Sequence, residues 1–168
     1  MIGKRGRPPK VVVKEDKKVN VWAGKTGLSL NLGCGDHLEP GYVNIDIAAE
    51  CDLKLDLEDA DFPFDDESCD RIYASQIMEH ISPRRFIPLM NECHRVLKKN
   101  GQLVIEVPLY PAKECFGDPQ HVKVFTQDSF KYFDARDDLY RRHEYGIKPY
   151  KLVMQKPKNW NLIAELIK

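Results

Sequence analysis

Long hydrophobic runs and net charge are both missing from this 168-residue sequence, in which 26 Lys and Arg residues balance 26 Asp and Glu residues. No apolar run approaches the roughly 20 residues that span a bilayer, and residues 1–18 contain no hydrophobic signal core. The five cysteines are widely spaced and form no Cys-x-x-Cys pair, which argues against a disulfide framework and a ribbon-type zinc site. We therefore expect no membrane span, and a protein of the reducing cytoplasm.

The charges are unevenly distributed along the chain. Residues 1–18 hold seven basic and two acidic residues, whereas residues 46–70 hold eleven acidic residues and one basic residue, Lys54. The first stretch also contains glycine and two prolines and has little that could be buried. We expect residues 1–20 to form a flexible basic tail and residues 21–168 to form a single domain with one core.

Short apolar runs between turn residues predict a series of strands. Leu28, Leu30 and Leu32 alternate into a Gly-Cys-Gly turn, which is typical of a buried strand that ends in a tight loop. Further strands are expected at residues 42–46, 71–74 and 102–107, with a weaker one at 51–57. Apolar residues at spacings of three and four predict a helix over residues 88–99, with Lys98 and Lys99 in its last turn and Gly101 ending it. Strands that alternate with helical segments indicate a parallel sheet with right-handed crossovers.

The end of the sequence breaks this alternation. Residues 150–155 and 161–167 both have the pattern of a strand, but only residues 156–160 connect them. A parallel pair needs about a dozen linking residues or more, so this pair must be an antiparallel hairpin. The predicted fold class is α/β, with a Rossmann-like, doubly wound and mostly parallel sheet that ends in an antiparallel hairpin.

The most specific local feature is the Gly-Cys-Gly turn at residues 33–35, followed by Asp46 at the end of the second strand. Glycines there let a ligand approach the backbone at the carboxyl edge of the sheet, and the acid can accept both hydroxyls of a ribose. A dinucleotide site would have a third glycine where Leu38 stands and an acid about 20 residues further on. Asp46 comes earlier than that, which favours an adenosine without a pyrophosphate. The alternative is a plain glycine turn before a surface Asp.

Five segments occur in the order of a known family. They are residues 30–35 (Leu-Asn-Leu-Gly-Cys-Gly), 41–46 (Gly-Tyr-Val-Asn-Ile-Asp), 62–74 (Phe-Pro-Phe-Asp-Asp-Glu-Ser-Cys-Asp-Arg-Ile-Tyr-Ala), 78–81 (Met-Glu-His-Ile) and 92–101 (Glu-Cys-His-Arg-Val-Leu-Lys-Lys-Asn-Gly). On these motifs, residues 28–108 resemble the class I S-adenosylmethionine-dependent methyltransferases, particularly the small type 11-like ones. The resemblance implies S-adenosylmethionine as the cofactor and methyl transfer to an acceptor that it does not identify.

The resemblance also implies roles for individual residues. Gly33 and Gly35 would line the methionine and ribose parts of the cofactor, and Asp46 would bind the ribose hydroxyls. Residues 56–58 would lie beside the adenine, and Gln76 would touch the methionine moiety. The full set of cofactor-binding residues implied in this way is Asn31, Gly33, Cys34, Gly35, Asp46, Ile47, Asp56, Leu57, Glu58 and Gln76.

Two histidines are candidates for catalysis. Methyl transfer from a sulfonium needs a general base only where the acceptor must lose a proton, and an imidazole suits that task. His80 follows Glu79 after the fourth strand and His121 follows the fifth, so both belong near the carboxyl edge of the sheet. The alternative for each is a structural role. The acidic residues 65–67 are interpreted as a solvated turn, and no metal site is predicted.

The segment after the fourth strand narrows the class of acceptor. Enzymes that methylate amino groups of DNA bases use an Asn/Asp-Pro-Pro-aromatic loop there, and cytosine-C5 enzymes use a Pro-Cys. This sequence has Ala-Ser-Gln-Ile at residues 74–77 and leaves little room for a base-flipping domain. A small molecule, a lipid or a protein is therefore a better candidate acceptor than a DNA base.

The basic tail contains a second, shorter resemblance. Residues 4–10 (Lys-Arg-Gly-Arg-Pro-Pro-Lys) resemble an AT-hook. This implies a weak contact with the minor groove of A·T-rich DNA through Arg5, Arg7 and Pro8. A solubilising basic tail explains the composition equally well.

Two other functions stay open on the sequence. One is a DNA-tethered, non-catalytic module with a methyltransferase-like body, against which Gly33, Gly35 and Asp46 argue. The other is a nicotinamide-dependent oxidoreductase, which Leu38 and the early position of Asp46 disfavour.

Overall fold

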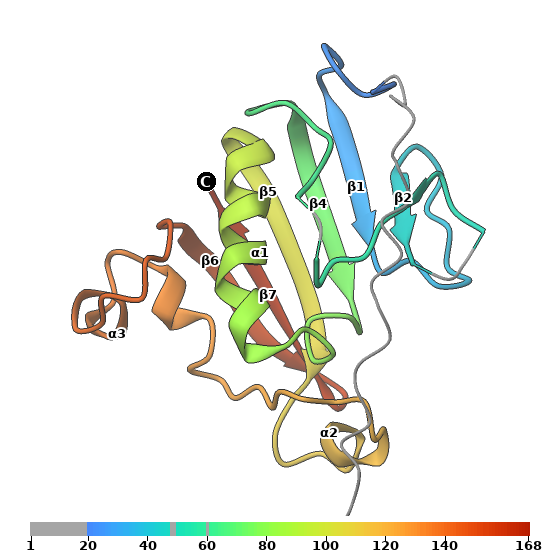
Figure 1. The fold of residues 1–168 in the computed structure, drawn as a ribbon. Helices are drawn as coiled ribbons and strands as arrows, with labels where there is room; N and C mark the ends of the chain where they lie inside the picture. Colours follow the sequence, from blue (N-terminus) through green and yellow to red (C-terminus); the bar gives the residue numbers. More distant parts are fainter. Residues whose placement is uncertain (1–19, 48–49, 60) are drawn as a thin grey trace, which may run out of the picture.

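The computed structural model describes residues 20–47, 50–59 and 61–168, and these form one seven-stranded sheet in the order β3-β2-β1-β4-β5-β7-β6 (Figure 1). The tail expected at residues 1–20 lies outside these ranges except for its last residue, and so do Arg5, Arg7 and Pro8. The DNA contact inferred for those three residues stays a prediction.

The first five strands are parallel neighbours, as the sequence predicted. They are β1 (Leu28–Leu32), β2 (Val43–Asp46), β3 (Leu53–Lys54), β4 (Cys69–Ser75) and β5 (Leu97–Pro108). Strand β3 is shorter than the expected 51–57. Only Leu53 and Lys54 pair with β2, because the Asp56 side chain then accepts a hydrogen bond from the Glu58 N–H at 2.9 Å and turns the chain.

The antiparallel hairpin is also confirmed, which completes the predicted fold class. Strand β7 (Asn161–Ile167) pairs antiparallel with β5 on one side and with β6 (Lys151–Lys158) on the other. Strand β6 runs past the expected end at Gln155, so the connection is a two-residue turn at Asn159 and Trp160. Asn159 has a φ of +55°, a conformation that asparagine tolerates better than most residues.

The helix expected at residues 88–99 is displaced at both ends. Helix α1 spans Pro83–Val96, and the Ser82 side chain caps it by accepting a hydrogen bond from the Arg85 N–H at 3.3 Å. At the other end Leu97 is extended, fully buried and paired with β4, so the chain passes directly into β5. Lys98 and Lys99 therefore lie in a strand, and Gly101 does not end the helix.

Helix α1 covers one face of the sheet and lies in front of β5 in Figure 1. Its buried residues recur at spacings of three and four and join the strand residues in one core: Phe86, Leu89, Met90, Cys93 and Val96. The other helical segments of the described chain are short: α2 (Glu114–Gly117), η1 (Lys131–Phe133) and α3 (Asp138–Arg141).

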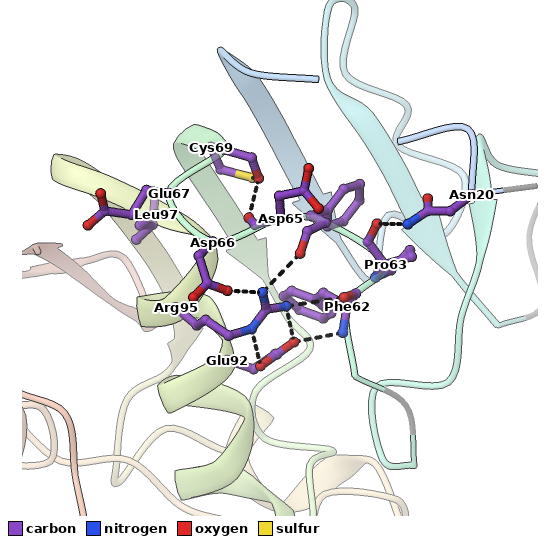
Figure 2. Close-up of polar contacts among 12 residues, drawn as sticks. Asn20, Phe62, Pro63, Asp65, Asp66, Glu67, Cys69, Glu92, Arg95 and Leu97 are labelled. Atoms are coloured by element: carbon purple, nitrogen blue, oxygen red, sulfur yellow. Dashed lines mark hydrogen bonds and ion pairs between the residues drawn. The ribbon is translucent and has the colours of Figure 1, made fainter. Parts of the chain in front are cut away.

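Arg95 fastens α1 to the turn that precedes β4 (Figure 2). Its guanidinium donates to the carboxylates of Glu92 and Asp66 at 2.6 Å each, and to the carbonyls of Phe64 and Phe62 at 3.0 and 3.2 Å. The acidic residues 65–67 are thus exposed, as a solvated turn should be, but they are also held by ion pairs and hydrogen bonds within the protein.

Asp134 performs a similar task between η1 and β6. Its carboxylate, which is 8% exposed, accepts hydrogen bonds at 2.9 Å from the Arg136 side chain, the Arg136 backbone and the Leu152 N–H. The hydrogen bonds from the Arg136 side chain lower the pKa of Asp134 to about 2. Because this pKa lies below the ordinary value of about 3.9, the carboxylate stabilises the fold above about pH 4 and ceases to do so as the pH falls toward 2.

We expect Asp134→Asn to lower the free energy of unfolding by about 2 kcal/mol at pH 7. The difference between variant and wild type should narrow below about pH 4 and vanish once the pH falls well below 2, where the wild-type carboxyl is also protonated. Urea unfolding at a series of pH values measures this directly. A difference that stays constant over the whole series would show that the Asn side chain disturbs packing and that the charge contributes nothing.

Candidate active site

The turn after β1 is built around a glycine that has no space for a side chain. Gly33 has a φ of +63°, and a Cβ added there would lie 2.4 Å from Cγ1 and 2.7 Å from Cβ of Ile77. The backbone of this turn therefore packs directly against the segment that follows β4. The sequence explained this glycine by the approach of a ligand, whereas the structure adds the approach of Ile77.

The second glycine of the turn positions the acid at the end of β2. The Gly35 N–H donates to Oδ2 of Asp46 at 3.0 Å, which fixes the direction of the carboxylate. Below it, the buried Asn31 side chain donates to the His37 carbonyl and to the Asn44 side chain, both at 2.9 Å. These bonds hold the turn and the two strand ends as one unit.

Two cavities meet at this edge of the sheet, and they share Gly33 and Gln76. One has a volume of about 360 Å³ and lies on the side of Asp46; the other, of about 530 Å³, lies on the side of Asn31. All ten residues implied as cofactor-binding line one or both: Gly33, Asp46, Ile47, Asp56, Leu57, Glu58 and Gln76 line the first, and Asn31, Gly33, Cys34, Gly35 and Gln76 line the second. We call the two cavities together the cleft.

The wall of the cleft at residues 56–58 is held by the start of α1. The Glu58 carboxylate accepts a hydrogen bond from the Ser82 N–H, and the Leu57 carbonyl accepts one from Arg85 Nε at 2.9 Å. Leu57 itself belongs to the core. The Glu58 carboxylate thus has a bond within the protein, so a contact of this residue with the adenine stays a prediction.

Gln76 occupies the opposite wall, directly after β4. It has a φ of +53°, and its backbone N–H donates to the Glu106 carbonyl at 2.8 Å. This left-handed residue ends β4 and turns the following segment back over Gly33. The sequence indicated Gln76 as a site residue but not Ile77. Ile77 contacts Gly33 in space, but the two residues are far apart in the chain, so no local pattern indicates the contact.

The two candidate histidines come together beside the cleft. Their ring centroids are 4.7 Å apart in an edge-to-face arrangement, and His80 lines the smaller cavity next to Gln120. The backbone of Glu79 holds the two segments in place, because its carbonyl accepts hydrogen bonds from the Val122 N–H at 2.9 Å and the Lys123 N–H at 3.2 Å.

Glu79 completes this group as a buried carboxylate. Its side chain is 1% exposed, and Oε1 lies 4.0 Å from Nε2 of His121. Burial raises the pKa of Glu79 to about 7, while the charge of His121, when protonated, opposes this. Burial, and next the charge of His121, lower the pKa of His80. These three side chains are named the Glu79 cluster below.

A family model matches the part of the chain that contains most of the residues lining the cleft. Residues 34–105, which include Gly35, Asp46, Gln76 and Glu79, match the model of a methyltransferase domain. Over this range the chain is similar to a methyltransferase domain. No curated protein sequence matches the chain.

Solved methyltransferases share the fold of this domain at low sequence identity. A SAM-dependent methyltransferase from Archaeoglobus fulgidus matches with a TM-score of 0.60 and 16% identity, covering 88% of both chains. An S-adenosylmethionine-dependent methyltransferase from Mesorhizobium loti matches with a TM-score of 0.56 and 13% identity, covering 86% of this chain and 92% of the other.

A third structure of this kind contains the product form of the cofactor. It is the 1,6-didemethyltoxoflavin-N1-methyltransferase of Burkholderia thailandensis with bound 1,6-didemethyltoxoflavin and S-adenosylhomocysteine. It matches with a TM-score of 0.55 and 15% identity, covering 86% of this chain and 72% of the other. S-adenosylhomocysteine is the demethylated form of S-adenosylmethionine, the cofactor that the sequence motifs imply for this chain.

The sequence predicts no membrane span, and the structure allows the helices to be examined for one. Over residues 20–47, 50–59 and 61–168, no helix has both the length and the apolar character that a bilayer crossing requires.

Proposed function

We infer that the methyltransferase domain binds S-adenosylmethionine in the cleft and transfers its methyl group to a small molecule, a lipid or a protein. The observation that supports this most is that all ten residues implied as cofactor-binding line the two adjoining cavities. They come from the ends of β1, β2 and β4 and from the segment after β3, at the strand edge where ligands bind in open α/β sheets.

The adenosine half of the cofactor fits the side of the cleft that holds Asp46. A carboxylate there can accept both ribose hydroxyls, and the Gly35 N–H already orients it. Ile47 and Leu57 offer apolar contacts for the adenine on the same side. The methionine half would extend past Gly33 toward Gln76, the two residues at which the cavities meet.

The acceptor would then enter from the side of the Glu79 cluster. Because the sulfonium carries the reactivity, the protein has mainly to align the acceptor with the methyl group. His80 and His121 are the candidates to receive a proton from an acceptor that must lose one. Residues 74–77 lack the Pro-Pro or Pro-Cys loop of the DNA base methyltransferases, which disfavours a DNA base as acceptor.

Titration calorimetry with S-adenosylmethionine and S-adenosylhomocysteine tests this proposal. We expect an affinity in the micromolar range, which corresponds to about −8 kcal/mol. Asp46→Ala should weaken binding by about 1–3 kcal/mol, because the cofactor hydroxyls then lack an acceptor in a closed site. Asp36→Ala is the matched control, since Asp36 is an exposed acid of the same turn and should leave the affinity unchanged.

Two outcomes would contradict the proposal. Unchanged affinity in a folded Asp46→Ala variant would remove Asp46 from the site. Displacement of the bound ligand by NAD at similar concentrations would favour a nicotinamide site, which the spacing of Gly33 and Asp46 disfavours.

A further inference from the structure

The Glu79 cluster holds a buried carboxylate whose nearest candidate counter-charge, Nε2 of His121, lies 4.0 Å away. Neither carboxylate oxygen of Glu79 has a hydrogen-bond partner among the described residues, although both are fully buried. A buried carboxylate is expected to be paired, hydrogen-bonded or bound to a metal, because an unpaired one loses its hydration without compensation. The groups that face it are the imidazoles of His80 and His121.

His121 in its neutral form can present a nitrogen lone pair on the side of this carboxylate. Its Nδ1 lies 3.4 Å from the Cys115 carbonyl, which can only accept a hydrogen bond, so a neutral ring that donates there has its proton on Nδ1. Nε2 is then the unprotonated nitrogen, and it is the atom 4.0 Å from Oε1 of Glu79. A histidine that donates one N–H to a backbone carbonyl and offers the other nitrogen is the usual form of a metal ligand.

The three side chains also have the spacing that metal binding requires. One ligand atom from each of Glu79, His80 and His121 lies within 4.8 Å of the others. Ligand atoms of a tetrahedral site with bonds of about 2.0–2.2 Å lie roughly 3.3–3.6 Å apart. Closing the difference takes a movement of about 1 Å, which side-chain torsions can supply within the staggered wells they occupy.

We propose that Glu79, His80 and His121 form a binding site for a divalent transition-metal ion of the Zn²⁺ class. Two imidazole nitrogens and one carboxylate oxygen suit Zn²⁺ and its neighbours, whereas Mg²⁺ and Ca²⁺ prefer oxygen ligands alone. Three protein ligands leave a coordination position open, which is the arrangement of catalytic metal sites.

The position of the site suggests a role for the ion in binding the methyl acceptor. His80 lines the same cavity as Asp46 and Gly33, so an ion held by the cluster lies beside the cleft. It would take an oxygen atom of the acceptor at its open position and act there as a Lewis acid. This use rests on the proposed methyl transfer, but the metal site does not, since its ligands are none of the cofactor-binding residues.

Cobalt titration of the full chain, after dialysis against a chelator, tests the site. We expect one equivalent of Co²⁺ to give the visible absorption of a four- or five-coordinate ion, and Zn²⁺ to displace it. Glu79→Gln, His80→Ala and His121→Ala should each weaken binding more than about 100-fold, since loss of a mere supporting contact already costs 10–100-fold. Glu79→Gln keeps the shape of the side chain, so it retains the fold if either alanine variant fails to.

His143→Ala is the matched control for these variants. The His143 ring also contacts a backbone carbonyl through Nδ1, that of Leu139 at 2.8 Å, but it lies outside the Glu79 cluster. It should bind Co²⁺ as the wild type does. Equal binding by all three cluster variants would overturn the proposal, and so would a thiolate-to-cobalt charge-transfer band, which would place the ion on cysteines.

Calorimetry with S-adenosylmethionine on the same variants separates the two proposals. We expect His121→Ala to bind the cofactor with wild-type affinity while it loses Co²⁺. Cofactor binding without any Co²⁺ binding would overturn the metal site and leave the methyltransferase proposal standing. Co²⁺ binding at the cluster without cofactor binding would do the reverse.

Discussion

Replacing Gly33 with alanine should lower the free energy of unfolding more than any other single substitution in the turn after β1. A side chain at a φ of +63° costs about 1–2 kcal/mol. Overpacking against Ile77 adds about 1–3 kcal/mol, because the clash is with Cβ and Cγ1, which cannot swing away like the end of a long side chain. Urea unfolding should therefore show a loss of about 2–5 kcal/mol in total.

Two further variants separate the two contributions to this loss in the free energy of unfolding, the cost of the positive φ and the clash with Ile77. Gly35→Ala is the control, since Gly35 has a φ of +49° but nothing within 4 Å of an added Cβ. It should lose only the backbone part, about 1–2 kcal/mol. In an Ile77→Ala background, Gly33→Ala should likewise lose only that part. Equal losses for Gly33→Ala with and without Ile77 would show that the clash is relieved by a backbone shift.

Arg95→Met should produce the second large effect. The substitution keeps the aliphatic stem but removes the Arg95 hydrogen bonds to the Glu92 carboxylate, which keeps the bond from the Phe62 N–H at 2.8 Å. Burial raises the pKa of Glu92, but the hydrogen bonds from Arg95 and Phe62 outweigh it and lower this pKa. Leaving this carboxylate and the Phe64 carbonyl without Arg95 should cost about 2–4 kcal/mol, less than a fully buried pair because Arg95 is 32% exposed.

A control for Arg95→Met is offered by an exposed ion pair whose two residues are also three positions apart. Arg141 pairs with Asp138 three residues earlier, as Arg95 does with Glu92, but both side chains are more than half exposed. Arg141→Met should change the free energy of unfolding by less than about 0.5 kcal/mol. Adding Glu92→Gln to Arg95→Met should recover part of the loss, since the uncompensated charge is then gone. No recovery would assign the effect to the two backbone carbonyls.

The strands and the glycine turn could be predicted from sequence because their signals are local. Leu28, Leu30 and Leu32 alternate directly before the turn, and the short link after residue 155 admits only an antiparallel hairpin. The set of residues around Gly33 and Asp46 was accessible for the same reason, since parallel strand ends necessarily meet at one edge. The family resemblance supplied the remaining residues that are implied as cofactor-binding.

The boundaries of α1 were not accessible in this way. Apolar spacing continues from Leu89 through Leu97, so the pattern alone extends the helix to Lys99. What ends it at Val96 is the pairing of Leu97 with Cys69 of β4, a contact between segments far apart in the chain. Tertiary pairing overrides helix propensity here because Leu97 is fully buried where it pairs with β4.

The sequence by itself determined the α/β class, the hairpin and the glycine turn after β1, because each depends on residues that are neighbours in the chain. Three contacts were decided only by the tertiary structure. Ile77 packs against Gly33, and Arg95 forms hydrogen bonds with residues between 62 and 66. The buried carboxylate of Glu79 lies beside His121. Those contacts join segments that no spacing rule connects. They depend on where the chain returns after β5, when the carbonyl of Glu79 accepts hydrogen bonds from Val122 and Lys123 and brings His121 to the cleft.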